Sequence, residues 1–538
     1  MADALVLCGY SKVRFGTKPA GALVVANVIR SMGLTAAVID HSLAMPKEFL
    51  FRLIDKFVDI NTKFICVSTT LLGPPGSNIN AMKSCDRLLA PILDYIRTIS
   101  PNAKFIIGGS KMTAGEPTSL PFDYIVRGQA EVSLKAIILH EMRGDPLHTL
   151  SPGIVTDKIY GFNEFNTNTD LRPTSIDGVL DNETLPFEFG RGCVFQCAFC
   201  NYDMIGKKFG DYNKTEETIL SVLLSNYEKF GTTRYQLADD TLNDSDEKID
   251  RIYRISQRLP FELEFGAYIR VELLEKLSGS ASKLLDSGLR GANLGLETLN
   301  KTAGATVGKG YGMKAIQTLT NARKIWKDTV AVNANFIIGL PHDSFRDLKE
   351  QHNILVEADW LDHVFYTPLG IPHKGDSLFS QGLYKKYYTE TSTLHPHFQA
   401  AIKQHEETES YFAENLNWQS AEMNSGEAIL LARDFMFDFS AKRPYIVNNV
   451  TSFCVMSLLE NLTMHELRTM RYDDADKLLT GFAYKKIQRY IQKMLSPEIN
   501  IPSTPVIPAS YVNEIIPSAG FKGKRELPIE FRKEVYDN

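Results

Sequence analysis

Short apolar runs alternate with helix-length stretches along most of this chain, and that alternation limits the folds that are open to it. In the first part of the chain the apolar runs cover residues 4–8, 36–40, 64–68, 105–107 and 124–126. These runs are apolar on both faces, which is typical of parallel strands that helices cover on both sides. We therefore expect an α/β doubly wound parallel sheet over residues 1–150, which binds its ligands at the carboxyl ends of the strands.

A second series of strand-like runs begins near residue 185, and a helical stretch follows each run. The runs cover residues 187–189, 234–237, 264–268, 292–296, 334–338 and 363–366. Six β units in series predict a partial (β/α)6 barrel of the TIM type over residues 185–380. Residues 151–184 hold prolines and small polar residues without a sustained period, so we expect a linker there. Residues 381–538 are expected to be mostly helical, with a proline-rich extended tail.

Composition excludes several classes of protein. The chain has 59 Lys and Arg against 64 Asp and Glu, and the formal net charge of −5 argues against a basic nucleic-acid coat. Seven cysteines in 538 residues are too few for a secreted disulfide framework, which indicates a reducing cytoplasm. No apolar run reaches the ~18 residues that span a bilayer, and Asp3 stands where a signal peptide carries basic residues. We expect a cytoplasmic protein outside the membrane.

Three of the seven cysteines fall within eight residues, directly after the first barrel strand. Cys193, Cys197 and Cys200 follow the spacing Cys-x3-Cys-x2-Cys. Three thiolates can hold three irons of a cubane cluster and leave the fourth iron open to a substrate or cofactor. The alternative is a non-catalytic scaffold with structural zinc, but such a site is closed by four ligands. Residues 188–212 contain no histidine and no fourth cysteine.

With Phe199 before the last cysteine, the loop resembles the signature of the radical S-adenosylmethionine (radical SAM) enzymes, Cys-x3-Cys-x-aromatic-Cys. In that family the signature follows the first strand of a partial (β/α)6 barrel. The resemblance implies that Cys193, Cys197 and Cys200 hold a 4Fe-4S cluster whose open iron chelates S-adenosylmethionine. It also implies reductive cleavage of this cofactor to a 5′-deoxyadenosyl radical, which abstracts hydrogen from an unreactive C–H bond. An external electron donor such as flavodoxin or ferredoxin is implied as a partner.

Four more strand ends resemble positions that hold S-adenosylmethionine in this family. Asp239 and Asp240 follow the second barrel strand, where the family places an acidic motif that hydrogen-bonds the cofactor's amino group. Arg270 ends the third strand and is expected to pair with the cofactor carboxylate. Glu297 ends the fourth strand and is a candidate for a ribose or amino contact, and Gly339 lies in a Gly-x-Pro turn expected under the adenine. Helix caps, a solvated arginine and an ordinary strand-to-helix turn are the alternatives.

The expected first domain resembles the cobalamin-binding domain that precedes the barrel in one subgroup of these enzymes. The resemblance rests on glycine-rich strand ends such as Gly108-Gly109 and on the run Gly-Gln-Ala-Glu at 128–131. The chain lacks the Asp-x-His-x-x-Gly motif that supplies an axial histidine, and we expect His41 to be a surface or capping residue. With cobalamin bound, methyl transfer to carbon is expected. Without cobalamin, rearrangement, isomerisation or oxidation is expected.

The resemblance leaves the substrate open to small molecules and nucleoside-type compounds. One feature bears on this choice, a basic stripe over residues 484–493 that carries four cations and two tyrosines. Such a stripe is typical of a solvated helix face in an acidic protein. The alternative is a contact with a phosphate-bearing substrate or with nucleic acid, such as a modified nucleotide of viral DNA.

Overall fold

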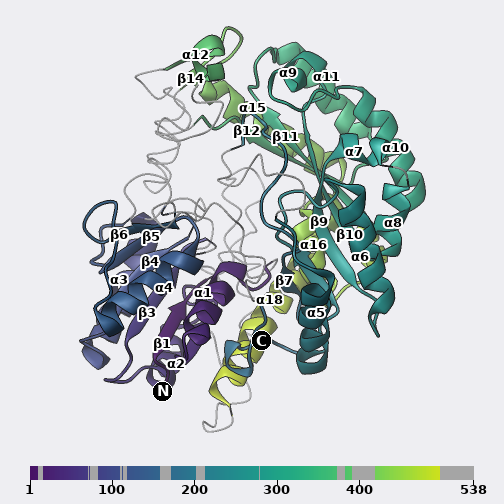
Figure 1. Ribbon diagram of the computed structural model, residues 1–538. Helices are drawn as coiled ribbons and strands as arrows, with labels where there is room; N and C mark the ends of the chain where they lie inside the picture. The colour runs from purple at the N-terminus through teal and green to yellow at the C-terminus, as the bar shows by residue number, and fades with distance from the viewer. Residues whose placement is uncertain are drawn as a thin grey trace. The chain divides into compact units, whose positions relative to one another are not determined.

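The computed structural model describes residues 1–9, 16–70, 72, 83–109, 112, 118–157, 171–200, 212–277, 279–371, 382–390 and 418–496. The chain divides into two compact units (Figure 1). Residues 1–183 and 477–496 of the described chain form the N-terminal unit, and residues 184–476 form the barrel unit. Residues 477–496 therefore belong to the same unit as the beginning of the chain, an arrangement that we did not expect.

A six-stranded sheet is the framework of the N-terminal unit. The strands are all parallel and run in the order β2-β1-β3-β4-β5-β6, which confirms the predicted doubly wound sheet. They are β1 (Ala4–Leu7), β2 (Ala36–Ile39), β3 (Phe64–Ser68), β4 (Lys104–Gly108), β5 (Tyr124–Arg127) and β6 (Ile154–Thr156). β6 lies within residues 151–184 and pairs with β5, so the expectation of a linker is wrong there. A strand of three residues is too short to show a period in the sequence.

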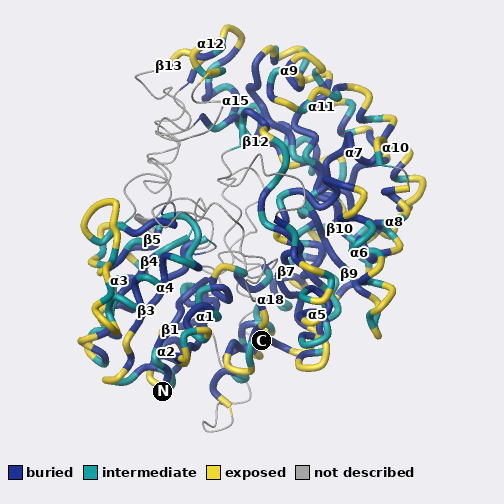
Figure 2. The backbone as a smooth tube through the Cα atoms, viewed as in Figure 1, coloured by how far each residue is buried: buried dark blue, intermediate teal, exposed yellow. Residues whose placement is uncertain are grey.

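Helices cover both faces of this sheet. α1 (Ala20–Ser31) and α4 (Ala130–Arg143) pack on one face, against a core that includes Val6 and Val38. α2 (Lys47–Phe57), α3 (Lys83–Ile99) and α18 (Tyr472–Leu495) pack on the other face, against a core that includes Leu5 and Leu7. Successive side chains of a strand point to opposite faces, so β1 contributes to both cores. Figure 2 shows the strands as buried and the outer sides of the helices as exposed.

α18 is the helix that contains the basic stripe. Ile487, Tyr490 and Ile491 are completely buried in the core of the N-terminal unit, and the Tyr490 hydroxyl accepts a hydrogen bond of 2.8 Å from Asp40 N. Apolar residues of this helix therefore cover one face of a sheet whose strands all lie more than three hundred residues earlier in the chain. Periodicity in the sequence shows that a helix has an apolar face, but it does not show which sheet that face covers.

Two cations of the stripe form ion pairs within the same unit. Lys486 Nζ lies 3.2 Å from Glu183, and Lys493 Nζ lies 3.0 Å from Asp181. The interpretation of the stripe as a solvated face therefore holds for its exposed residues, such as Arg489, and is wrong for the helix as a whole.

The barrel unit contains a second sheet of six parallel strands in sequential order, β7 to β12, which confirms the predicted partial barrel (Figure 1). The strands are β7 (Leu185–Phe187), β8 (Arg234–Leu237), β9 (Glu264–Ile269), β10 (Leu289–Glu297), β11 (Ala331–Ile338) and β12 (His363–Pro368). Helices follow the strands in turn: α5 (Glu216–Phe230), α6 (Asp246–Arg258), α7 (Val271–Lys276), α8 (Ser280–Asp286), α9 (Lys301–Thr306), α10 (Lys314–Trp326) and α11 (Phe345–Glu357).

Helices from the C-terminal part of the barrel unit close the sheet at two places. α15 (Ser425–Lys442) packs beside the edge strand β12, and α16 (Ser452–Leu458) packs against β8 to β11. Gly266 and Gly291 make room for α16, because a Cβ at either position would lie within 3.0 Å of that helix. α17 (Met464–Thr469) follows α16, in the part of the chain that we expected to be mostly helical.

Candidate functional site

The three clustered cysteines lie on the loop that leaves the carboxyl end of β7. Cys197 is buried, and Cys193 and Cys200 are half-buried. Cys200 N donates a hydrogen bond of 3.0 Å to Cys197 O, and Ala198 N donates one of 3.1 Å to Val307 O, which anchors the loop to the end of α9. The structure therefore places all three predicted thiols on one anchored loop at the carboxyl end of the sheet, where parallel barrels carry their chemistry.

The number of thiols on the loop bears on the choice between a cluster and a single zinc ion. Three cysteines can each bind a different iron of a 4Fe-4S cubane and leave the fourth iron open. A structural zinc site is closed by four ligands. The three thiols therefore suit the cluster and are one ligand short of a closed zinc site.

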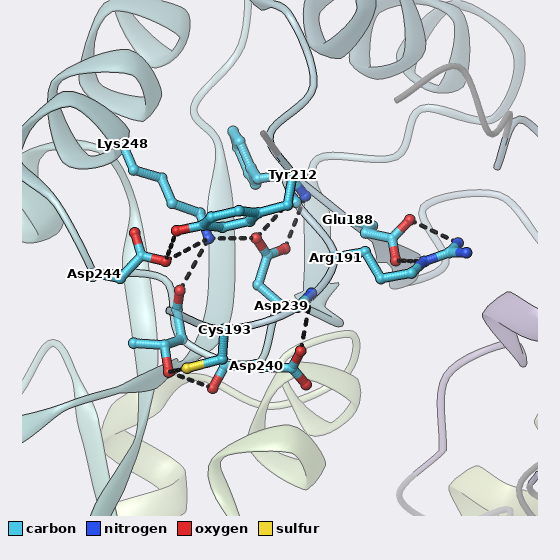
Figure 3. A network of polar contacts seen from close by, with 12 residues as sticks. Glu188, Arg191, Cys193, Tyr212, Asp239, Asp240, Asp244 and Lys248 are labelled. Atoms are coloured by element: carbon cyan, nitrogen blue, oxygen red, sulfur yellow. Dashed lines mark hydrogen bonds and ion pairs between the residues drawn. The ribbon is translucent and has the colours of Figure 1, made fainter. Parts of the chain in front are cut away.

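Asp239, just beyond β8, faces the cysteine loop and is completely buried (Figure 3). Its two carboxylate oxygens accept hydrogen bonds from Phe189 N at 2.8 Å and from Gly190 N at 2.9 Å, and Lys248 Nζ lies 3.0 Å from Oδ1. Burial raises the pKa of Asp239, while Lys248 and the backbone donors oppose the rise. These contacts do not suit the expected hydrogen bond to a cofactor amino group. The carboxylate instead holds the entry to the cysteine loop.

The two residues after Asp239 also contact the loop. Asp240 is half-buried and accepts a hydrogen bond of 3.1 Å from Gly192 N. Thr241 Oγ1 lies 3.4 Å from Cys193 Sγ. Burial, and then the negative charge of Asp239, raise the pKa of Asp240 to about 7. Because Asp240 is half-buried and Asp239 is completely buried among its own partners, Asp240 is the better placed of the two acids to meet an ammonium group.

Arg270, the residue between β9 and α7, joins the cysteine loop to its neighbours. Nη1 donates to Cys197 Sγ at 3.4 Å, Nη2 donates to Gly308 O at 2.8 Å, and Nε donates to Glu272 Oε1 at 2.6 Å. The guanidinium carbon also lies 3.7 Å from the centre of the Phe195 ring. The expected partner was a cofactor carboxylate. Two of the observed contacts of Arg270 are instead with the cysteine loop, at Cys197 and at Phe195. Its positive charge suits a thiolate at Cys197.

Glu297, at the end of β10, is a buried acid in a left-handed backbone conformation with φ of +62°. Its Oε1 lies 3.5 Å from Lys309 Nζ, which also donates a hydrogen bond of 2.9 Å to Gly295 O. Burial raises the pKa of Glu297, and Lys309 opposes the rise. Strained non-glycine backbone is concentrated at functional sites. Glu297 therefore stays a candidate for the cofactor contact.

Gly339 follows β11 with φ of +95°. A Cβ there would collide with the Trp418 ring, whose Nε1 donates a hydrogen bond of 2.8 Å to Leu369 O. Gly339 O accepts a hydrogen bond of 2.8 Å from the Tyr388 hydroxyl. The close approach that glycine permits is thus made by the protein's own indole, and we expected an adenine in that role. Phe199 is half-buried on the cysteine loop.

The carboxyl edge of the N-terminal sheet carries several buried polar atoms without a hydrogen-bond partner. They are Lys18 Nζ, Asp40 Oδ2, His41 Nδ1, Ser42 Oγ and Arg127 Nε. Lys18 Nζ still forms ion pairs, at 3.7 Å with Asp40 Oδ2 and at 3.8 Å with Glu183 Oε2. Buried polar atoms usually have hydrogen-bond partners, so this edge has polar groups that a water or a ligand can meet. Donors and acceptors along one sheet edge fit a ligand rich in amide groups, and cobalamin is such a ligand.

His41 is buried, so the expectation of a surface residue is wrong. Its backbone has φ of +56°, Nε2 lies 3.6 Å from Asp40 Oδ2, and the ring packs edge-on against Tyr490 at 5.4 Å. Burial lowers the pKa of the imidazole and favours its neutral form.

The sequence of the barrel unit matches a known protein family. Residues 187–352 match the sequence model of the Radical SAM superfamily, a stretch that begins at the last residue of β7 and contains the cysteine loop and the strands β8 to β11. The barrel unit is therefore similar to the radical SAM superfamily, as the cysteine spacing predicts.

Three known proteins narrow this class. An uncharacterized methyltransferase of Pyrococcus horikoshii is 22% identical over 316 residues, which are 53% of this chain and 64% of that protein, so the match spans less than two thirds of the relative. The radical S-adenosylmethionine methyltransferase TsrM from Kitasatospora setae, with cobalamin and a 4Fe-4S cluster bound, has a TM-score of 0.61 at 13% identity and covers 91% of this chain and 100% of its own. The cobalamin-dependent S-adenosylmethionine radical enzyme OxsB has a TM-score of 0.54 at 13% identity, with coverages of 91% and 79%. The chain shares the fold of the subgroup with a cobalamin-binding-type domain before the barrel.

The sequence analysis missed three side chains of the site. Lys248 and Glu272 lie on helices, and Thr241 follows the acidic pair. Lys248 reaches back from the first turn of α6 to Asp239, and Glu272 reaches Arg270 from the first turn of α7. Thr241 could have been found, because a residue that adjoins an acidic motif at a strand end shares its edge of the sheet.

Proposed function

We propose that this chain is a cobalamin-dependent radical SAM enzyme that transfers a methyl group to an unactivated carbon of a small-molecule or nucleoside-type substrate. The observation that carries the proposal is the loop of Cys193, Cys197 and Cys200, anchored at the carboxyl end of a parallel six-stranded barrel. The likeness to two proteins described as methyltransferases favours methyl transfer over the isomerase alternative.

The residues of the barrel unit divide into those that hold the loop and those that face a ligand. Cys193, Cys197 and Cys200 would each bind one iron, and Arg270 would stabilise the negative charge on Cys197. With the cluster, S-adenosylmethionine and cobalamin bound, the site supplies a 5′-deoxyadenosyl radical and a methyl group. Asp240 would accept hydrogen bonds from the amino group of S-adenosylmethionine, and Glu297 would accept them from its ribose.

The N-terminal unit would bind cobalamin through the carboxyl edge of its sheet. His41 Nδ1, Ser42 Oγ and Arg127 Nε, which lack a hydrogen-bond partner, would hydrogen-bond the amide groups at the rim of the corrin ring. Glycines at the same edge keep the strand ends free of large side chains, as at Gly109, where φ is +111°.

Three observations bear on where the protein is located and on its partners. No helix in the described part of the chain is long and apolar enough to cross a membrane. All seven cysteines are free, which supports our proposal of a reducing, cytoplasmic location with an external electron donor such as flavodoxin or ferredoxin. The ion pairs of Lys486 and Lys493 weaken the nucleic-acid alternative, because the basic stripe was its only support.

Anaerobic reconstitution tests the proposal. The purified chain should bind about four irons and four sulfides and should form 5′-deoxyadenosine when reduced with S-adenosylmethionine. Cys197→Ala should abolish that cleavage, whereas Cys454→Ala, which changes a half-buried cysteine of α16, should leave it unchanged. One zinc per chain without sulfide would contradict the proposal.

Cobalamin and methyl transfer are tested separately. The reconstituted chain should retain a corrinoid absorbance after desalting and should form S-adenosylhomocysteine in the presence of substrate. If 5′-deoxyadenosine forms but neither the corrinoid nor S-adenosylhomocysteine is found, the isomerase alternative is supported instead.

A further inference from the structure

We propose that Lys248 is a positioning residue for the iron–sulfur cluster, which it affects through residues 239–241 and the loop that carries Cys193. The inference rests on the proposed function, in which this loop holds the cluster. Lys248 lies in the first turn of α6, outside any motif of the sequence, and its side chain is only 2% exposed. A lysine is seldom buried to this degree unless its charge is paired.

The cysteine loop and residues 239–241 are joined residue by residue (Figure 3). Asp239 accepts hydrogen bonds from the first two backbone N–H groups of the loop, those of residues 189 and 190. Asp240 accepts one from the backbone N–H of residue 192, and the Thr241 hydroxyl lies 3.4 Å from Cys193 Sγ. A shift of this segment would therefore move both the loop backbone and the hydroxyl that meets the first ligand.

Lys248 ties both ends of that segment. Its Nζ lies 3.0 Å from Asp239 Oδ1 and donates a hydrogen bond of 2.9 Å to Thr241 O. It also lies 3.8 Å from Asp244 Oδ2 and 5.5 Å from the centre of the Tyr212 ring. The ammonium group has three N–H donors, and these contacts account for where they can point. Compensation of the Asp239 charge requires only that the ammonium group lies near the carboxylate. The hydrogen bond from Lys248 Nζ to Thr241 O is additional to that.

This geometry has a chemical consequence beyond folding. Hydrogen bonds to ligand sulfurs and the orientation of the ligands tune the reduction potential and retention of an iron–sulfur cluster. If Lys248 only neutralised Asp239, another cation at position 248 would keep the cluster unchanged. If Lys248 positions Thr241 and the loop through its bond to Thr241 O, a cation of another shape would keep the fold and leave the cluster perturbed.

The test uses reconstituted full-length protein and follows iron loss to a ferrous chelator, the electron paramagnetic resonance spectrum of the reduced cluster and its midpoint potential. Lys248→Met should lose iron at least tenfold faster than the wild type. The matched control is Lys283→Met, because Lys283 forms a partly exposed pair with Asp250 at 2.6 Å on another helix of the unit. This control should lose iron within twofold of the wild-type rate.

Two more variants separate positioning from charge compensation. Lys248→Arg keeps a positive charge beside Asp239, so it should melt near the wild-type temperature and still lose iron faster with an altered resonance spectrum. Thr241→Val should keep its iron and shift the midpoint potential. Wild-type iron retention in Lys248→Met, or wild-type behaviour of the cluster in Lys248→Arg, would overturn the proposal. If Lys248→Met does not fold, Lys248→Arg decides alone, and a wild-type chain without iron and sulfide would contradict the proposed function instead.

Discussion

Replacing Arg270 by methionine is expected to release the cysteine loop. Arg270 Nε lies 2.6 Å from Glu272 Oε1, and the side chains are only 9% and 10% exposed. Removing one member of a buried ion pair costs roughly 3–5 kcal/mol, because the other charge stays buried without compensation. That cost falls on the fold of the barrel unit, because Glu272 lies on α7 and not on the loop. The loop itself loses the hydrogen bond to Cys197 Sγ, and a hydrogen bond to a charged group contributes about 1.5–3 kcal/mol. Even about 1.5 kcal/mol corresponds to a change of about 10-fold in the equilibrium between held and released loop.

Two measurements check this magnitude. Iron bound to the reconstituted variant should be lost to a chelator at least about 10-fold faster, if release of the loop limits the loss. The melting temperature of the barrel unit should fall by about 6 °C, at roughly 2 °C for each kcal/mol in a unit of this size.

The control for Arg270→Met is Arg290→Met at the opposite end of the barrel strands. Arg290 Nε lies 3.0 Å from Glu264, which also pairs with Arg234 and so keeps a partner. Such a partly exposed pair contributes about 1 kcal/mol or less. If Arg270→Met retained iron and melted like this control, the assignment of Arg270 to the loop would be refuted.

In the N-terminal unit, Gly128→Ala should lower the melting temperature far more than Gly144→Ala. Both glycines have positive φ, +86° and +74°, which costs an alanine about 1 kcal/mol or more. Only at Gly128 would the Cβ also collide with a neighbouring carboxylate. Equal melting temperatures of the two variants would argue against this packing. Acid should release α18: although burial raises the pKa of Glu183, Lys18 and Lys486 hold it at about 2 in the folded state. Because this pKa lies below the ordinary 4.5, the stabilisation is complete above about pH 4.5 and is lost toward about pH 2. Hydrogen exchange of the α18 amides should accelerate over that range, and Glu183→Gln should remove this dependence.

Much of the fold can be predicted from local pattern. Runs that are apolar on both faces, separated by helical stretches, predict parallel strands without any knowledge of their partners. The first barrel strand was expected at 187–189 and lies at Leu185–Phe187, because the apolar run continues into the loop through Phe189. β6 and the place of α18 could not be predicted, since both depend on contacts with residues far along the chain.

The site shows the same division. The cysteine loop is a local motif, so its three thiols were found directly. Asp239 and Arg270 were found as strand-end residues, but the structure directs them to the loop: Asp239 to its backbone and Arg270 to Cys197. A strand end shows that a side chain lies at the edge of the sheet, and it does not show whether a ligand or another loop meets it there.

Pattern along the chain was enough to predict the group of three cysteines, the two parallel sheets and the resemblance to the radical SAM superfamily, because each prediction depends on residues that are close in sequence. Tertiary structure decided which acid is buried under the loop, that Lys248 holds residues 239–241, that Trp418 occupies the space beside Gly339, and that α18 completes the first sheet. These outcomes depend on burial, and a charge or an indole finds its partner in space only after distant segments have packed together.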